Sequence, residues 1–160
     1  MSRPLTLTAL LLVSAAWLTA LAVTPVAGAR WGRGGAQFGA AMYAAGSLIC
    51  HQRPERSFHL DGAQLPVCAR CSGLYAGVSL GVLGWMGLAG IGRRASSRAR
   101  FWTARVRTVV IVMAVPTLVT VATAWLGLWD PGNVVRAVFA LPLGAVAGGL
   151  VTAVSARDLE

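Results

Sequence analysis

Four long, uncharged apolar runs constrain this chain more than any other feature. About 20 apolar residues in a helix cross the hydrocarbon core of a bilayer, and in lipid each backbone amide must find its partner inside its own segment. Hydrophobic residues make up 56% of the chain and charged residues only 12%, which is far from the balance of a soluble domain. The sequence therefore predicts one polytopic membrane domain over residues 1–160, an all-α integral membrane helical bundle of about four transmembrane helices. The runs are Leu5–Val23, Cys71–Ile91, Thr108–Leu128 and Ala137–Ala156.

The arginines predict the orientation. The net charge is +9 and all 14 basic residues are arginine, six of them between residues 93 and 107. A loop this basic stays on the cytoplasmic side, which places residues 30–70 on the outer face and the C-terminus, Arg157–Glu160, in the cytoplasm. Charges in loops between spans meet anionic lipid headgroups rather than nucleic acid. We expect a multi-pass protein of the inner, cytoplasmic membrane with its second span at 71–92, a basic loop at 93–107, a third span at 108–128 and a fourth at 134–156.

The N-terminal third leaves two alternatives open. Residues 1–29 are a first span or a cleaved secretory signal, because Arg3 precedes the apolar run and Ala27-Gly28-Ala29 resembles a cleavage site. An apolar core of about 19 residues is longer than signals usually have, which favours a span. The segment Gly34–Ile49 is apolar but only 16 residues long, so it predicts an interfacial or re-entrant helix or a thin fifth span.

All three cysteines and both histidines lie between Cys50 and Cys71. A Cys-x-x-Cys pair, Cys68 and Cys71, brings two sulfurs to one ion, and a distant cysteine and histidine complete the Cys3His set of a closed zinc site. Either His51 or His59 can supply the nitrogen. Metal binding can also provide the folding free energy that a loop with few apolar residues lacks. The sequence therefore predicts an outer cap, residues 30–70 with a short helix, that is folded around a structural metal ion.

The sequence excludes some other uses of the cysteines and leaves two open. Covalent c-type haem needs a histidine directly after Cys-x-x-Cys, where this chain has Ser72, and an all-cysteine iron–sulfur cluster needs four thiolates. Thiol redox chemistry stays open, because Cys-x-x-Cys is the arrangement of dithiol oxidoreductases and Arg70 lies between the two cysteines. Any disulfide would leave one of the three cysteines unpaired. Inert, packed cysteines are the remaining alternative.

Polar and glycine residues of the same stretch form a distinctive pattern: Cys50-His51-Gln52, Pro54-x-Arg56-Ser57-Phe58, Gly62-x-Gln64-x-Pro66-Val67-Cys68-x-Arg70-Cys71 and Gly73-x-Tyr75-x-Gly77, followed by Asn133-x-x-Arg136. In this pattern, over roughly residues 40–150, the chain resembles a family of small prokaryotic membrane proteins known only as a domain of unknown function. The resemblance implies no activity, but it places Gln52, Ser57 and Asn133 in one motif with the cysteines. The position of His59 is usually apolar in that family, which favours His51. The expected zinc ligands are then Cys50, His51, Cys68 and Cys71.

A second group of candidate site residues consists of arginines. Arg136 begins the last run at the outer side, near the membrane depth of Cys68, and a charge there requires a partner. It either reaches the outer headgroups or joins an anion site, such as one for a lipid phosphate. The anion-binding set that we expect in the second case is Arg53, Arg56, Arg70 and Arg136.

Glycines repeat at every fourth residue in two of the runs. Such stripes let helices approach closely, either inside one bundle or in a homodimer or larger membrane complex. They are Gly73, Gly77 and Gly81 in the second run, and Gly144 and Gly148 in the fourth.

The predicted function is a binding or accessory role in the membrane, with lipids as partners. Four protein ligands leave a metal no open position for catalysis, so the pattern favours a protein that is not an enzyme. A membrane thiol–disulfide redox protein that uses Cys68 and Cys71 is the first alternative. A small metal-ion transporter is the second, which the scarcity of polar residues in the middle of the runs disfavours.

Overall fold

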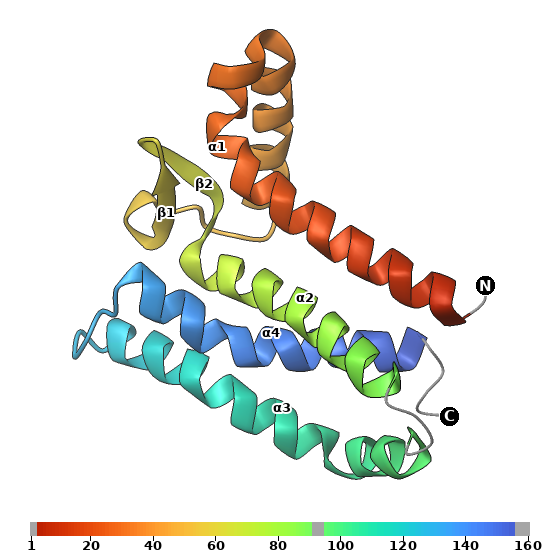
Figure 1. Cartoon of the computed structure of the whole chain (residues 1–160). Coiled ribbons are helices and arrows are strands. Elements are labelled where there is room, and N and C mark those ends of the chain that lie inside the picture. Colours follow the sequence, from red (N-terminus) through yellow and green to blue (C-terminus); the bar gives the residue numbers. More distant parts are fainter. Residues whose placement is uncertain (1–2, 91–94, 156–160) are drawn as a thin grey trace.

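The computed structural model of the protein describes residues 3–90 and 95–155, and the side chains of residues 4–87 and 105–155. Helices dominate this part of the chain, and one short antiparallel hairpin interrupts them (Figure 1). The predicted helical bundle is therefore confirmed. The elements are α1 (Arg3–Ser47), η1 (Pro54–Arg56), β1 (Ser57–Leu60), β2 (Ala63–Cys68), α2 (Ala69–Gly90), α3 (Ala95–Trp125) and α4 (Asn133–Ser155).

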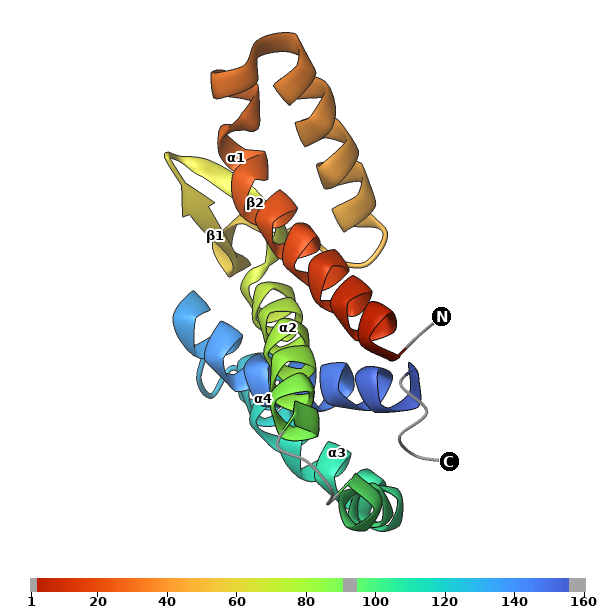
Figure 2. The same cartoon turned by 45° about the vertical axis from the view of Figure 1, so that its right-hand side comes forward.

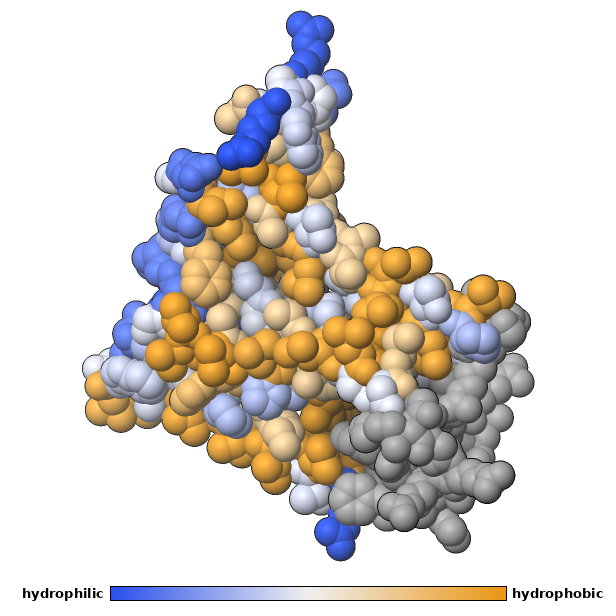
Figure 3. Space-filling view, viewed as in Figure 1, coloured by the Kyte–Doolittle hydropathy of each residue, from blue (hydrophilic) through white to orange (hydrophobic). Residues whose placement is uncertain are grey.

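Within the described residues, three helices are long and apolar enough to cross a membrane. The qualifying segments are Pro4–Ser47 of α1, Arg105–Trp125 of α3 and Asn133–Ser155 of α4. Only 6% of the most apolar window of α3 is buried inside the molecule, as expected for a helix that faces lipid. Apolar surface accordingly covers much of the molecule in Figure 3. A membrane crossing by α2 stays a prediction.

Glycines set the contact between α2 and α4, which lie side by side (Figure 1). A Cβ atom added at Gly77 would lie 2.3 Å from the Leu141 carbonyl oxygen, and one added at Gly144 would lie 2.2 Å from the Leu74 carbonyl oxygen. The two predicted stripes thus pack against each other within one chain, which was one of the two alternatives. On the other side of α4, the Thr117 hydroxyl of α3 donates to the Phe139 carbonyl at 2.8 Å.

α1 is a helical hairpin rather than one rod. Its helical geometry breaks at Trp31 and Gly32, and Gly32 has a φ of 57°, a left-handed conformation that glycine adopts without steric cost. The return arm, residues 33–47, lies antiparallel to the end of the first arm (Figure 2), and a Cβ at Gly35 would lie 2.0 Å from the Ala27 carbonyl oxygen. The first helical arm therefore extends past Val23, and most of the ambiguous segment 34–49 is this return arm.

The cap holds a two-stranded sheet, which the sequence analysis did not predict. β1 and β2 pair antiparallel, with Leu60 opposite Ala63, and the two-residue turn between them is Asp61-Gly62. Both turn residues have positive φ, 51° and 80°. This is the geometry of a type I′ turn, for which Asp-Gly is a preferred pair. The turn therefore fixes the register that brings Cys68 back to the end of the bundle.

The cap and the start of α3, which falls within the predicted basic loop, lie at opposite ends of the bundle. In Figures 1 and 2 the β-hairpin and the α3–α4 turn lie at one end, while the start of α1, the end of α2 and the end of α4 lie at the other. Hydrophilic residues gather along the cap edge (Figure 3). The side chains of Arg93, Arg94, Arg98 and Arg100 and the C-terminal Arg157–Glu160 are outside the described residues, and the outer location of the cap stays a prediction.

Candidate metal centre

Three sulfur atoms converge where the cap meets the helices. The Sγ atoms of Cys50, Cys68 and Cys71 all lie within 4.8 Å of one another, and all three thiols are free. Sulfur ligands of a tetrahedral zinc ion with Zn–S bonds near 2.3 Å lie about 3.8 Å apart. The sulfur cluster, as we call these three Sγ atoms, therefore needs shifts of about an ångström to hold a metal. Its convergence was predicted from the spacing.

Each cysteine is delivered by a different element. Cys50 follows the return arm of α1, Cys68 is the last residue of β2, and Cys71 lies in the first turn of α2. Beside them is a small apolar core in which Cys50 and Val67 are buried, together with one residue from each arm of α1. A metal at the sulfur cluster would therefore join three segments of chain. The buried core residues are Leu21, Met42, Cys50 and Val67.

The surroundings of Cys68 favour its thiolate, whereas the hydrogen bond with Cys68 and burial raise the pKa of Cys71. The Cys68 backbone N–H donates to the Cys50 Sγ at 3.1 Å. Cys68 also directly precedes α2, where the helix dipole favours a negative charge. Hydrogen bonding with the Cys71 side chain, partly opposed by burial, lowers the pKa of Cys68 to about 5. Since the thiolate is the form that binds metal and attacks disulfides, both kinds of chemistry are served by this geometry.

Gln52 is the main hydrogen-bonding centre of the cap. It has a φ of 48°, and its Nε2 donates to the carbonyls of Tyr43 and Pro66, each at 2.7 Å. The Gln64 Nε2 donates to the Gln52 carbonyl at 2.6 Å and to the Ser57 Oγ at 3.2 Å. These bonds connect the return arm of α1, the segment after Cys50 and both strands. The motif residues Gln52 and Ser57 therefore shape the cap.

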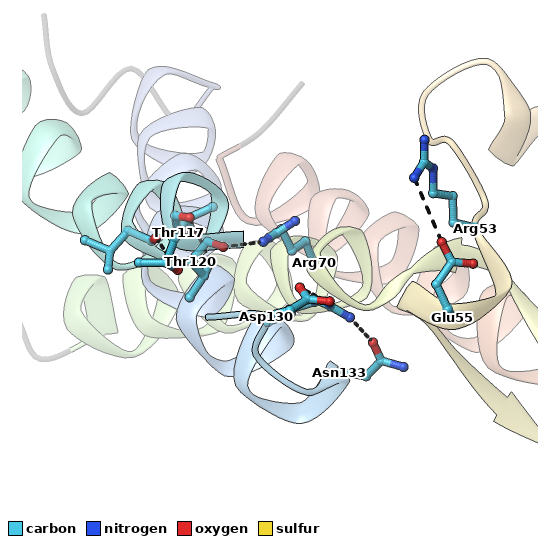
Figure 4. A network of polar contacts seen from close by, with 10 residues as sticks. Arg53, Glu55, Arg70, Thr117, Thr120, Asp130 and Asn133 are labelled. Carbon is cyan, nitrogen blue, oxygen red and sulfur yellow. Dashed lines mark hydrogen bonds and ion pairs between the residues drawn. The ribbon is translucent and has the colours of Figure 1, made fainter. Parts of the chain in front are cut away.

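Asn133 and Arg136 fasten the cap to α4. The Asn133 Nδ2 donates to the Ser57 carbonyl at 2.9 Å. The Arg136 Nη1 donates to the Asn133 Oδ1 at 2.8 Å, the bond drawn at Asn133 in Figure 4. Arg136 is only 4% exposed, and its Nη2 contacts the Asp130 Oδ1 at 2.5 Å. The hydrogen bond from Arg136 holds the pKa of Asp130 below its ordinary value. Asp130 is thus the partner that the charge of Arg136 requires, and sequence reasoning missed it.

The histidines lie outside the sulfur cluster. His51 is exposed, but it lines a cavity together with Cys68, so it lies on the same side of the cap as the sulfurs. His59 is exposed on β1, where it pairs with Gln64. Neither belongs to the group of ligand atoms that the described residues bring together. The structure therefore assembles three of the four predicted ligands.

Three of the four predicted anion-binding arginines share that cavity, which we call the arginine cavity. Its volume is about 360 Å³. The Arg70 Nη2 donates to the Thr120 carbonyl of α3 at 2.9 Å, which directs the side chain across the end of the bundle (Figure 4). Arg136 does not line the cavity. The lining residues are His51, Arg53, Arg56, Cys68, Arg70 and Trp125.

Residues 50–150 match the model of a family described as "Predicted membrane protein (DUF2085)". The chain belongs to this family. The DUF2085 match includes the sulfur cluster, the cap hairpin and α2 and begins after α1, so the resemblance inferred from the motif is confirmed.

Two uncharacterised archaeal proteins are similar to this DUF2085 chain. One, from Methanocaldococcus jannaschii, is 55% identical over 42 residues, which are 26% of this chain and 27% of that protein. The other, from Methanothermobacter thermautotrophicus, is 31% identical over 96 residues, which are 60% of this chain and 78% of that protein. No solved structure matches the chain.

Proposed function

We propose that the sulfur cluster binds one zinc ion that holds the cap in shape, with His51 as the fourth ligand. The observation that carries the proposal is the convergence of three free thiols from three separate elements to within 4.8 Å. His51 is adjacent to Cys50 and exposed, so its side chain is free to turn toward the sulfurs. Thiolates together with an imidazole are a donor set that zinc prefers.

A structural role for the ion follows from the weakness of the cap itself. Its strands have only 4 and 6 residues, and an isolated two-stranded hairpin is marginally stable at best. A closed site would supply folding free energy without an open position for catalysis. We therefore propose a binding or accessory role rather than an enzymatic one. The cap would lie outside the cytoplasmic membrane, as the arginine-rich loop indicates, and present an anion site there.

Elemental analysis of the detergent-purified full chain tests the zinc proposal. We expect one zinc per chain and three thiols that react with a thiol reagent only after chelation. His51→Ala should weaken zinc binding at least about tenfold, the effect of losing even an outer-shell partner, whereas His59→Ala, a matched exposed histidine, should not. Metal-free protein, or equal zinc affinity in the two histidine variants, would refute the site or its fourth ligand, respectively.

Thiol redox activity is the second candidate, and the position of Cys68 before α2 favours it. In this reaction the Cys68 thiolate would attack a disulfide of a partner protein, bond to one sulfur and release the other as a thiolate. Cys71 would then attack Cys68, forming the Cys68–Cys71 disulfide and releasing the second partner sulfur, with the two cysteine protons ending on the partner. Purified protein with no metal, one free thiol and a reducible disulfide would support this candidate over zinc.

The structure adds no support for metal-ion transport. The buried hydroxyls of the described helices donate to carbonyls of their own helices; they belong to Thr24, Ser79, Thr120 and Thr152. They therefore do not point to a polar path along the bundle.

A further inference from the structure

The arginine cavity lies at the end of the bundle where α3 leaves its apolar segment. Trp125 is the last residue of the segment of α3 that can cross a membrane; it lines the cavity and is 90% exposed. Tryptophan at the end of a span marks the headgroup level of a bilayer. The cavity is therefore at the depth of lipid phosphates. Another cavity, of about 270 Å³ between α1, α2 and α4, is lined almost entirely by apolar side chains.

The charges of the cavity are unbalanced. Among the described residues, those lining it carry three guanidinium groups and no carboxylate, and the Cys68 thiolate balances only one of the three positive charges. Arg53 has a long ion pair with Glu55, 4.0 Å between largely exposed groups, which contributes little. Arg56 has no side-chain hydrogen bond or ion pair within the described part of the chain. Two of the three cations thus have no carboxylate partner.

Arg70 is the most constrained of these cations. One of its nitrogens donates to a backbone carbonyl, but its Nε is buried without a hydrogen-bond partner among the described residues. The nearby carboxylate of Asp130 is already bound by Arg136. Like charges held together at a partly buried site repel each other, and an anion with several oxygens removes that repulsion. Guanidinium groups match phosphate oxygens in particular, because each can donate two parallel hydrogen bonds.

We propose that Arg53, Arg56 and Arg70 bind a phosphate group in this cavity, beside the metal centre and against Trp125. The inference names the ligand class of the proposed anion site and rests on that binding role, but it does not require zinc. It also excludes Arg136 from the ligand contacts, because Asp130 and Asn133 already occupy its terminal nitrogens. The source of the phosphate is an anionic lipid headgroup or free phosphate.

Native mass spectrometry of the detergent-purified full chain, with added phosphatidic acid or phosphatidylcholine, tests the lipid source. A thermal shift with inorganic phosphate tests the free one. Arg56→Gln should weaken binding of phosphatidic acid, of inorganic phosphate or of both by about tenfold, the effect of one charge-assisted hydrogen bond. The double variant Arg56→Gln/Arg70→Gln should no longer bind the phosphate probe.

The matched control is Arg30→Gln/Arg33→Gln, which removes the same charge from two exposed arginines at the tip of α1. It should keep the wild-type binding. Loss of phosphatidic acid adducts only in the cavity variants identifies a lipid ligand, and loss of the phosphate thermal shift alone identifies free phosphate. Equal binding of both probes by the cavity and control variants would overturn the proposal. Zinc content, measured on the same samples, should be unchanged in Arg56→Gln, so failure of the anion site is distinguishable from failure of the metal site.

Discussion

The contact between α2 and α4 gives a prediction whose sign depends on which glycine is changed. A Cβ at Gly77 would lie 2.3 Å from the Leu141 carbonyl oxygen and 2.9 Å from the Ala145 amide nitrogen. Both are backbone atoms of a helix, so no side chain can rotate out of the way. Ordinary contact begins at 3.4 Å, and Gly77→Ala must therefore push the helices apart by about an ångström in a close-packed interface.

The expected cost follows from a matched substitution in the same helix. A Cβ at Gly84 would have no atom within 4 Å. Replacing glycine by alanine inside a helix stabilises it by about 1 kcal/mol, whereas overpacking costs about 1–3 kcal/mol. Gly84→Ala should raise the free energy of unfolding by up to about 1 kcal/mol, and Gly77→Ala should fall below it by about 1–3 kcal/mol.

Tryptophan fluorescence during heating of the detergent-solubilised full chain measures the difference, provided that both variants are heated at one scan rate. A chain of this size loses about 2–4 °C of apparent melting temperature per kcal/mol. We therefore expect Gly77→Ala to melt about 2–12 °C below Gly84→Ala. Equal melting temperatures would show that the two helices do not meet at Gly77.

Three further predictions concern the cap and its attachment. Asp130→Asn should lower the apparent melting temperature at pH 7, and because the pKa of Asp130 is held below its ordinary value by Arg136, the difference from wild type should shrink steadily as the pH falls from about 3.9 through that lowered pKa. Asn133→Ala should cost about 1–3 kcal/mol by leaving the Ser57 carbonyl without its donor, seen as faster hydrogen exchange in β1. Gln52→Ala removes two hydrogen bonds of about 1 kcal/mol each, so the cap should open more often. After the metal has been removed with a chelator, alkylation of the buried Cys50 should therefore accelerate on the order of tenfold.

Thr123→Ala is the control for all three, because its exposed hydroxyl makes only a local bond to the Val119 carbonyl. A melting difference for Asp130→Asn that stays constant between pH 7 and pH 2 would contradict the ion pair. Unchanged exchange in Asn133→Ala would contradict the link from α4 to the cap. Unchanged alkylation in Gln52→Ala would show that the cap stays closed without that side chain.

Much of the helical fold could be predicted because the signal is local. An uncharged apolar run such as Thr108–Leu128 has one stable form in lipid, and α3 ends at Trp125, within that run. The β-hairpin was missed although Asp61-Gly62 is a strong turn signal, because its strands are short and carry little alternation. The return arm of α1 was ambiguous because 16 apolar residues suit several environments.

The candidate site, too, could be predicted only in part from the sequence. The sequence indicated that Cys50, Cys68 and Cys71 act together, because a Cys-x-x-Cys pair and a distant cysteine followed by a histidine form a zinc-ligand pattern. It did not indicate which charges are already paired. The bond from Asn133 to Ser57 joins residues 76 positions apart, and only the packing of α4 beneath the cap brings them together.

By itself, then, the sequence determined that this is a helical membrane protein and which sulfur and nitrogen donor atoms its cap carries, because hydropathy and donor atoms belong to each residue separately. Only the tertiary structure decided that Asp130 neutralises Arg136 while Arg56 and Arg70 stay without carboxylate partners in one cavity. The physical reason is that the electrostatic energy of a charge depends on distances between segments, and those distances exist only once the helices have packed.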